Sequence, residues 1–177
     1  MLNESANDIP TDAGGAEAAP VAIRQATVDD VATIAPLFDA YRQFYRAAPD
    51  PEGVRHFLTH RLAQGESVIF LATLVVGATG APEAERAIGF TQLYPCFSST
   101  AMRPMWILND LFVAPEARRQ GAARALLQRA RAFGESVGAV ELMLQTAVEN
   151  HTAQALYRAL GWRRDDEYDV FLLPLGG

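Results

Sequence analysis

The spacing of apolar residues changes several times along the chain, and each change predicts a new element. Val21 to Ala26 alternate as a strand does, and Thr27 with Asp30 has the capping-box pattern that starts a helix. Pro36 falls inside this helix and is expected to kink or break it. The same reasoning predicts strands over residues 67–76, 87–94, 105–113, 140–146 and 170–175, an irregular stretch over 95–104, and helices over 54–63, between Gln120 and Gly138, and over 152–160.

This order of elements, β-α-α-β-β-β-α-β-α-β, predicts an α/β protein whose central sheet has mixed strand directions. Residues 1–20 are rich in Ala, Gly, Asp and Pro and contain few large apolar residues, so we expect a flexible N-terminal tail. The sequence of residues 21–177 shows no internal repeat and no sign of a second domain. We therefore expect one domain over 21–177.

Charge and composition narrow the class of protein. The formal net charge is -6, which disfavours non-specific binding to nucleic acid. The N-terminal stretch lacks a basic region and an apolar run, and no apolar stretch approaches a membrane span, so we expect a cytoplasmic protein without a membrane partner. His56 and His60 lie four residues apart but no further ligands accompany them, so no metal site is expected.

The turn between the strand at 105–113 and the next helix could bind an anion. A helix N-terminus has unpaired N–H groups and a partial positive charge. Gly121 has no side chain, so its backbone can approach a phosphate closely, and Arg118, Arg119 and Arg124 add donors nearby. The alternative is an ordinary strand–helix connection with solvated arginines.

Two motifs in this region resemble those of the GCN5-related N-acetyltransferase (GNAT) family. RRQGAA at 118–123 resembles the family's R/Q-x-x-G-x-G/A signature, and NHTAQALYRALGW at 150–162 resembles its second motif. Arg119 and Ala123 stand where many members have glycine. The resemblance implies a mixed sheet whose parallel strands splay apart at the cofactor site, flanked by helices, and it implies acetyl-CoA as co-substrate.

The resemblance also assigns residues to the cofactor. The signature loop would bind the pyrophosphate through backbone N–H groups, and the strand before it would hydrogen-bond the pantetheine arm as an added strand. The residues expected to bind the cofactor are Leu111, Phe112, Val113, Arg118, Arg119, Gln120, Gly121, Ala122, Ala123, Arg124, Thr146, Asn150, Ala153 and Tyr157.

Three residues are candidates for the chemistry. Tyr157 lies at the family's general-acid position, where it would protonate the departing thiolate, although it also lies on an apolar helix face and could be a core residue. Asn109 occupies a position where some relatives have glutamate, and an amide cannot act as a base. Asp110 remains as a possible base, directly or at the end of a water chain, and a structural role for it is an open alternative.

The expected acceptor is a primary amine of a small molecule such as a polyamine or amino acid. The stretches at 41–45, 89–99 and 106–111 resemble the branch that holds diamine acetyltransferases and the yeast Hpa-type enzymes. Candidate walls of the acceptor pocket are Tyr45, Tyr94, Phe97 and Trp106, each of which could instead be core. Acetylation of protein lysines and a catalytically silent acyl-CoA sensor are the alternatives. The family analogy implies a homodimer.

Overall fold

The computed structural model describes residues 20–76 and 84–175 of the 177-residue chain. The expected tail at 1–20 therefore lies outside the described residues except for Pro20. The elements, in chain order, are β1 (Val21–Gln25), the 3₁₀ turn η1 (Val28–Asp30), α1 (Val31–Phe44), α2 (Pro51–Ala63), β2 (Val68–Val76), β3 (Ala84–Ser98), β4 (Arg103–Val113), the 3₁₀ turn η2 (Pro115–Ala117), α3 (Ala122–Ser136), β5 (Leu142–Met143) and α4 (His151–Ala159).

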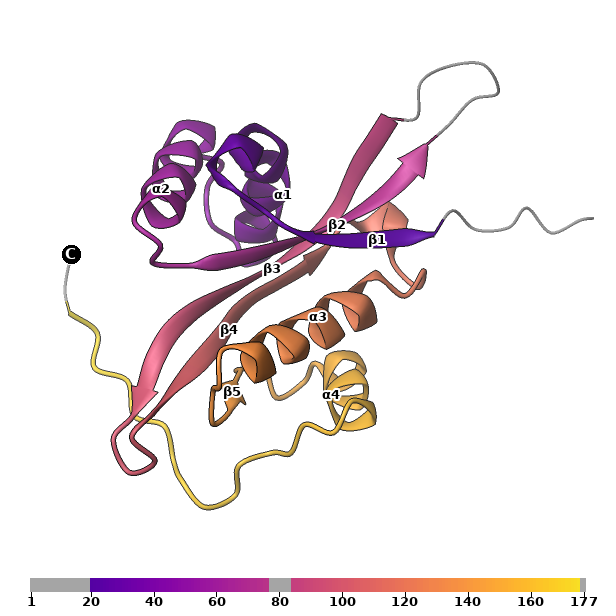
Figure 1. The fold of residues 1–177 in the computed structure, drawn as a ribbon. Helices are drawn as coiled ribbons and strands as arrows, with labels where there is room; N and C mark the ends of the chain where they lie inside the picture. Colours follow the sequence, from indigo (N-terminus) through magenta and orange to yellow (C-terminus); the bar gives the residue numbers. More distant parts are fainter. Residues whose placement is uncertain (1–19, 77–83, 176–177) are drawn as a thin grey trace, which may run out of the picture.

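The five strands form one sheet in the order β1-β2-β3-β4-β5 (Figure 1). The first three pairings are antiparallel, and β4 pairs with β5 in parallel. This is the mixed α/β sheet that the sequence predicts. Helices α1 and α2 cover one face of the sheet, while α3 lies on the other with α4 beside it (Figure 1).

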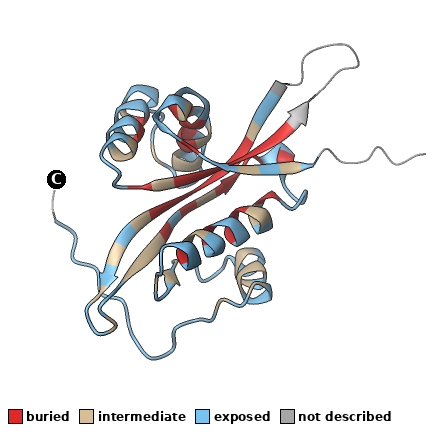
Figure 2. Ribbon diagram, viewed as in Figure 1, coloured by how far each residue is buried: buried red, intermediate tan, exposed pale blue. Residues whose placement is uncertain are grey.

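Each face of the sheet has its own apolar core. On the α1/α2 side, Ile34 and Leu58 pack against Phe90. On the α3 side, Leu126 and Leu127 pack against the opposite face of the sheet. Figure 2 shows the buried stripe of α3 turned toward the strands. Burial on both faces fixes which way each strand side chain must point.

The capping residues act slightly differently from the prediction. Thr27 and Asp30 do form the predicted capping box, but it caps the short turn η1, from which α1 continues. Helix α1 runs through Pro36 without a break, which corrects the expected interruption. Helix α2 begins three residues earlier than expected because the Asp50 side chain accepts a hydrogen bond from the Gly53 N–H at 2.9 Å.

The stretch at 95–104 is not irregular, as the sequence suggested. Strand β3 continues to Ser98, residues 99–102 turn, and β4 begins at Arg103. Pro95 is accommodated opposite Trp106 within this long hairpin. The sequence prediction failed here because proline and the polar residues that follow it are typical of loops.

The predicted last strand at 170–175 is also wrong for this structure. Residues 163–175 follow α4 without a helix or strand. The apolar side chains from Val170 to Leu175 are between 67% and 91% exposed. In the described part of the chain, no helix is long and apolar enough to cross a membrane.

Candidate active site

A cleft of about 640 Å³ opens where β4 and β5 separate. The two strands pair only at Trp106 with Leu142 and at Ile107 with Met143. Beyond these pairs, residues 108–113 and 144–146 face each other across the cleft instead of bonding. The strand predicted over 140–146 is thus shortened to Leu142–Met143, because its second half has no partner strand.

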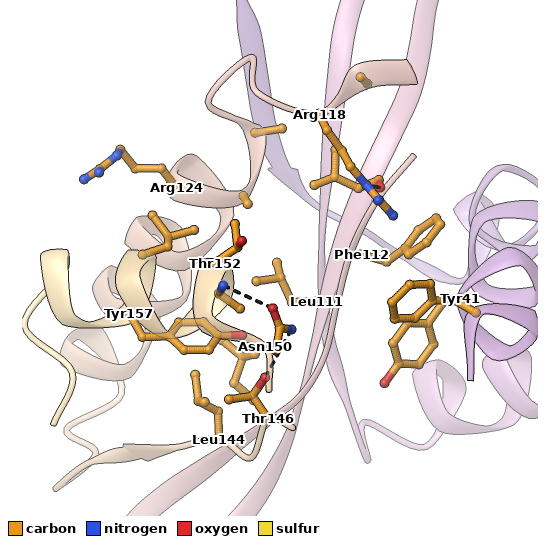
Figure 3. Close-up of a pocket in the computed structure, with 18 of the residues that line it drawn as sticks. Tyr41, Leu111, Phe112, Arg118, Arg124, Leu144, Thr146, Asn150, Thr152 and Tyr157 are labelled. Carbon is orange, nitrogen blue, oxygen red and sulfur yellow. Dashed lines mark hydrogen bonds between the residues drawn. The ribbon is translucent and has the colours of Figure 1, made fainter. Parts of the chain in front are cut away.

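The lining comes from β4, the turn before α3, the segment after β5, and helices α1 and α4. The lining residues are Tyr41, Phe44, Tyr45, Leu108, Asn109, Leu111, Phe112, Val113, Ala117, Arg118, Arg119, Gly121, Ala122, Ala123, Arg124, Leu144, Gln145, Thr146, Asn150, Thr152, Ala153, Leu156 and Tyr157. Figure 3 shows Tyr157 and Tyr41 on opposite sides of this space, with Leu111 between them.

The turn before α3 presents backbone donors to one end of the cleft. Arg119 (φ 63°) and Gly121 (φ 84°) both have left-handed backbone conformations, which orient the first N–H groups of α3. No side chain caps this helix, and no acid lies in its first turn. A Cβ added to Gly121 would meet no atom within 4 Å, so space for a ligand remains beside the backbone.

Arginine side chains add positive charge at the same end. The Arg118 Nε donates to the Val113 carbonyl at 3.1 Å, which ties the turn to the end of β4. Arg124 lies at the cleft margin in Figure 3. Within residues 20–76 and 84–175, neither Arg119 nor Arg124 forms an ion pair. These donors fit a pyrophosphate, as the sequence predicted for this turn.

The sequence-predicted cofactor residues are almost all brought together here. Leu111, Phe112 and Val113 line one wall, and Thr146, Asn150 and Ala153 line the other. Asn150 also has a structural role, because its Oδ1 caps α4 by accepting from the Ala153 N–H at 3.2 Å. Gln120 is the exception: its side chain points to the Glu116 carbonyl at 3.4 Å and does not line the cleft.

Tyr157 is half-buried and lines the cleft from α4. Its ring packs near Trp162, with ring centroids 6.1 Å apart, so it serves the core and the cleft together. Burial raises the pKa of Tyr157, and so does the nearby Tyr45 hydroxyl, whereas the Thr146 side chain lowers it. With the pKa above its ordinary value near 10, the hydroxyl keeps its proton at neutral pH.

Strand β4 has a bulge at Asn109, next to Asp110. The register with β3 shifts so that Gln92 faces Asp110 and Leu93 faces Leu108, which leaves Asn109 as the extra residue. Asn109 lines the cleft. Asp110 points to the α1 side, where it is only 4% exposed.

The Asp110 carboxylate is held in an apolar setting with few partners. Burial raises its pKa, and Tyr41 and Asn109 lower it. The Asn109 amide donates to Oδ1 at 3.1 Å, whereas Oδ2 has no partner with hydrogen-bond geometry within the described ranges. A buried carboxylate with a raised pKa accepts a proton more readily than an exposed aspartate does.

Three of the four predicted acceptor walls lie outside the cleft. Trp106 points to the α3 core and packs on Phe133 with ring centroids 4.8 Å apart. Phe97 is 77% exposed near the far end of β3. Tyr94 is half-buried on the α1/α2 side of the sheet, where burial and Asp110 raise its pKa to about 12. Only Tyr45 lines the cleft.

Two aromatic residues that the sequence analysis did not name as acceptor walls line the cleft. Tyr41 and Phe44 join Tyr45 at the cleft from the last turns of α1. Their spacing of three and four residues was a usable signal, because such positions share one helix face.

This fold and cleft define an acetyl-CoA-dependent N-acetyltransferase. Residues 34–162 match the model of the acetyltransferase (GNAT) family, and the chain belongs to that family. Its members use acetyl-CoA as the acetyl donor. The narrower resemblance to the diamine acetyltransferase and yeast Hpa-type branch stays a prediction.

Relatives support the assignment along most of the chain. An uncharacterised N-acetyltransferase of Bacillus subtilis, YhfO, is 48% identical over 85% of this chain and 95% of its own length. An aminoglycoside N(6')-acetyltransferase of Stenotrophomonas maltophilia is 30% identical over 86% of this chain and 93% of its own.

Solved structures agree in fold. The crystal structure of a probable acetyltransferase superposes with a TM-score of 0.80 and 44% identity, covering 88% of this chain and 99% of that one. An aminoglycoside N-acetyltransferase in complex with CoA has a TM-score of 0.69 at 20% identity, covering 91% of this chain and 99% of that one.

Proposed function

We propose that the protein transfers the acetyl group of acetyl-CoA to the primary amine of a small molecule by direct attack. The observation that supports this most is the cleft itself. It combines an opened sheet edge, an unpaired helix N-terminus and a tyrosine hydroxyl in one continuous space. Each feature suits one part of acetyl-CoA or of the reaction.

Acetyl-CoA would lie along β4. The backbone of Leu111–Val113 faces the gap left by β5, so amides of the pantetheine arm can extend the sheet there. The pyrophosphate would then reach Arg119–Ala123, where the N–H groups and arginines concentrate. In this arrangement the thioester would lie near Tyr157 and Asn109, which line the same cleft.

The reaction needs one proton removed and one supplied. The neutral amine nitrogen forms a bond to the acetyl carbon, the C–S bond breaks, and its electrons leave on sulfur. Tyr157 would donate its proton to that sulfur, which gives free CoA thiol. Asp110 would accept the amine proton through water, because its side chain does not itself line the cleft.

The amine that accepts the acetyl group is a separate question. By its name the Stenotrophomonas relative acts on aminoglycosides, so an aminoglycoside is one candidate beside polyamines and amino acids. Acetylation of protein lysines would use the same cleft. A silent acyl-CoA sensor is disfavoured by the presence of both Tyr157 and Asp110 at the cleft and beside it.

Release of CoA thiol from acetyl-CoA tests the proposal. The purified protein would be mixed with acetyl-CoA and a panel of polyamines, amino acids, aminoglycosides, arylalkylamines and lysine peptides, with a control lacking acceptor. Release that depends on a small amine supports the proposal. Release only with peptides would replace it by lysine acetylation. Binding of acetyl-CoA without release across the panel would leave a sensor.

We also propose that the protein forms a homodimer. The apolar side chains of residues 170–175 are exposed, and among the described strands β5 lies at the edge of the sheet, paired with β4 alone. Contact with a second copy would cover this apolar segment. Light scattering during gel filtration tests this: a mass near twice 19.2 kDa supports the dimer, and a monomer at micromolar concentration excludes it. A cytoplasmic location remains a prediction from the sequence.

A further inference from the structure

The two ends of the cleft differ in chemistry. Its three arginines, Arg118, Arg119 and Arg124, all come from the turn before α3 and the first turn of that helix. The end formed by α1 is aromatic, with Tyr41, Phe44 and Tyr45. Among the described residues, no aspartate or glutamate lines the cleft.

The aromatic side chains form a continuous series from the surface into the cleft. Phe44 and Tyr45 meet edge to face with ring centroids 5.2 Å apart, and Tyr45 meets Tyr41 at 5.1 Å. Tyr41 in turn lies 6.2 Å from Phe112, which lines the cleft from β4. The series therefore connects the outer rim of the cleft with the wall where the thioester would lie.

The outer two rings are left uncovered. Phe44 is 62% exposed and Tyr45 is 61% exposed, although both are large and adjoin the cleft. Adjacent exposed aromatic rings at a cleft mark a surface that an apolar or aromatic ligand can cover. Tyr45 and Tyr157 line the same cleft, so a ligand on these rings would extend into the space that Tyr157 lines.

Two acids that belong to α1 and to the start of α2 already have hydrogen-bond partners. Asp39 accepts from Arg42 at 3.0 Å, from Gln43 at 2.9 Å and from the Asp50 N–H at 3.0 Å. Asp50 caps α2 through its side chain. Asp110 interacts with Tyr41, which lines this end, and it is buried. Asp110 does not itself line the cleft, so it could reach an ammonium group only through water. Since no described aspartate or glutamate lines the cleft, a polycation bound here would leave most of its charges without partners.

We infer that the acceptor is an amine with a single positive charge on an aromatic body, an arylalkylamine, and not a polyamine or an aminoglycoside. The inference rests on the proposed acetyl transfer and names the substrate class of the same cleft. The aromatic body would stack on Tyr45 and Phe44, and its amine would lie between Tyr157 and Asn109. The amine nitrogen takes the acetyl group, CoA leaves as the thiol, and no other reactant is needed.

The test compares kcat/KM for matched amines at saturating acetyl-CoA. The probes are 2-phenylethylamine and tryptamine, n-butylamine as a singly charged amine without a ring, and spermidine and kanamycin as polycations. We expect the arylalkylamines to exceed n-butylamine by roughly tenfold, because stacking adds to the burial of the ring. We expect the polycations to be poorer than the arylalkylamines.

Variants connect the preference to the rings. In Tyr45→Ala, the ratio of kcat/KM for 2-phenylethylamine over n-butylamine should fall close to one. Phe97→Ala is the control, because Phe97 is also an exposed aromatic residue but lies outside the cleft, and the ratio should persist there. A ratio that survives in Tyr45→Ala would overturn the inference.

The substrate class and the acetyl-transfer activity can be refuted separately. Efficient turnover of spermidine or kanamycin with poor turnover of arylalkylamines would overturn the substrate class and leave acetyl transfer standing. No thiol release with any amine, while calorimetry shows acetyl-CoA binding, would refute the proposed function itself and the inference with it.

Discussion

Replacing Tyr157 with phenylalanine isolates the role of a single hydroxyl. The ring packs near Trp162 and lines the cleft, and phenylalanine keeps both features. What is lost is the proton donor and its interaction with Thr146. Loss of one such interaction costs about 0.5–1.5 kcal/mol of stability, so the variant should fold.

The expected loss of rate is larger than the loss of stability. A positioned acid or base contributes about 10²–10⁴-fold to a rate. The raised pKa keeps the Tyr157 proton in place at neutral pH but makes it a weak acid, so we expect the lower part of that range. A fall of about 10²-fold in kcat corresponds to about 2.7 kcal/mol in the barrier.

Steady-state thiol release at pH 8 measures this change. The KM for acetyl-CoA should stay within about twofold, because the hydroxyl acts on the leaving sulfur and not on the cofactor arm. Tyr168→Phe is the control, since Tyr168 is exposed and lies outside the cleft. An unchanged kcat in Tyr157→Phe would remove Tyr157 from the mechanism, and a higher KM with unchanged kcat would reduce it to a binding residue.

Three further predictions follow from other parts of the structure. Asp110→Asn should lower kcat by about 10²-fold. If Asp110 is the base, the rate of the unaltered enzyme should fall at low pH as Asp110 is protonated, and the variant should lose this fall; an unaltered pH–rate profile excludes Asp110 as the base. Gly121→Ala should weaken acetyl-CoA binding in calorimetry by more than about tenfold, because the added methyl group would occupy the side of the turn proposed to face the phosphates. Gly138→Ala is the control: Gly138 has the same left-handed backbone, with a strain of about 1–2 kcal/mol for alanine, but lies outside the cleft, so this variant should bind acetyl-CoA normally. Asp30→Asn should lose about 1 kcal/mol in urea unfolding at pH 7, since Arg24 and the capping box hold the pKa of Asp30 at about 2. That contribution is complete above pH 3.8 and fades as pH falls through 2, so a deficit that persists at pH 2 contradicts the assignment.

The placement of the turn before α3 at the cleft could be predicted because its features are local. A strand, a glycine and a helix start lie within a few residues, and the N–H groups of a helix start are unpaired in any fold. The same holds for Tyr157 and Asn150, which one short helix carries into the cleft.

The acceptor walls could not be predicted because a bulge reverses the alternation of β4. With strict alternation, Trp106 and Asp110 would share one face of the sheet. The extra residue at Asn109 sends Trp106 to the α3 core and Asp110 to the α1 side. The pattern of apolar residues does not reveal where a bulge lies, since that depends on pairing with β3.

The last strand was predicted from β-prone residues that the structure leaves exposed. Phe171 and Leu173 have strand propensity, but a strand needs a partner with free backbone groups. Among the described residues, the segment after α4 pairs with no strand of the sheet. The strand propensity of a segment does not reveal whether another strand is placed to pair with it.

The most direct test of the account is hydrogen–deuterium exchange with and without acetyl-CoA. The account predicts slower exchange at Leu111–Val113 and Arg119–Ala123, because these backbone amides would bond the pantetheine arm and the pyrophosphate. Helix α2 (Pro51–Ala63) should exchange unchanged as an internal reference. If calorimetry shows that acetyl-CoA binds while neither segment is protected, the cofactor lies elsewhere and the account is contradicted.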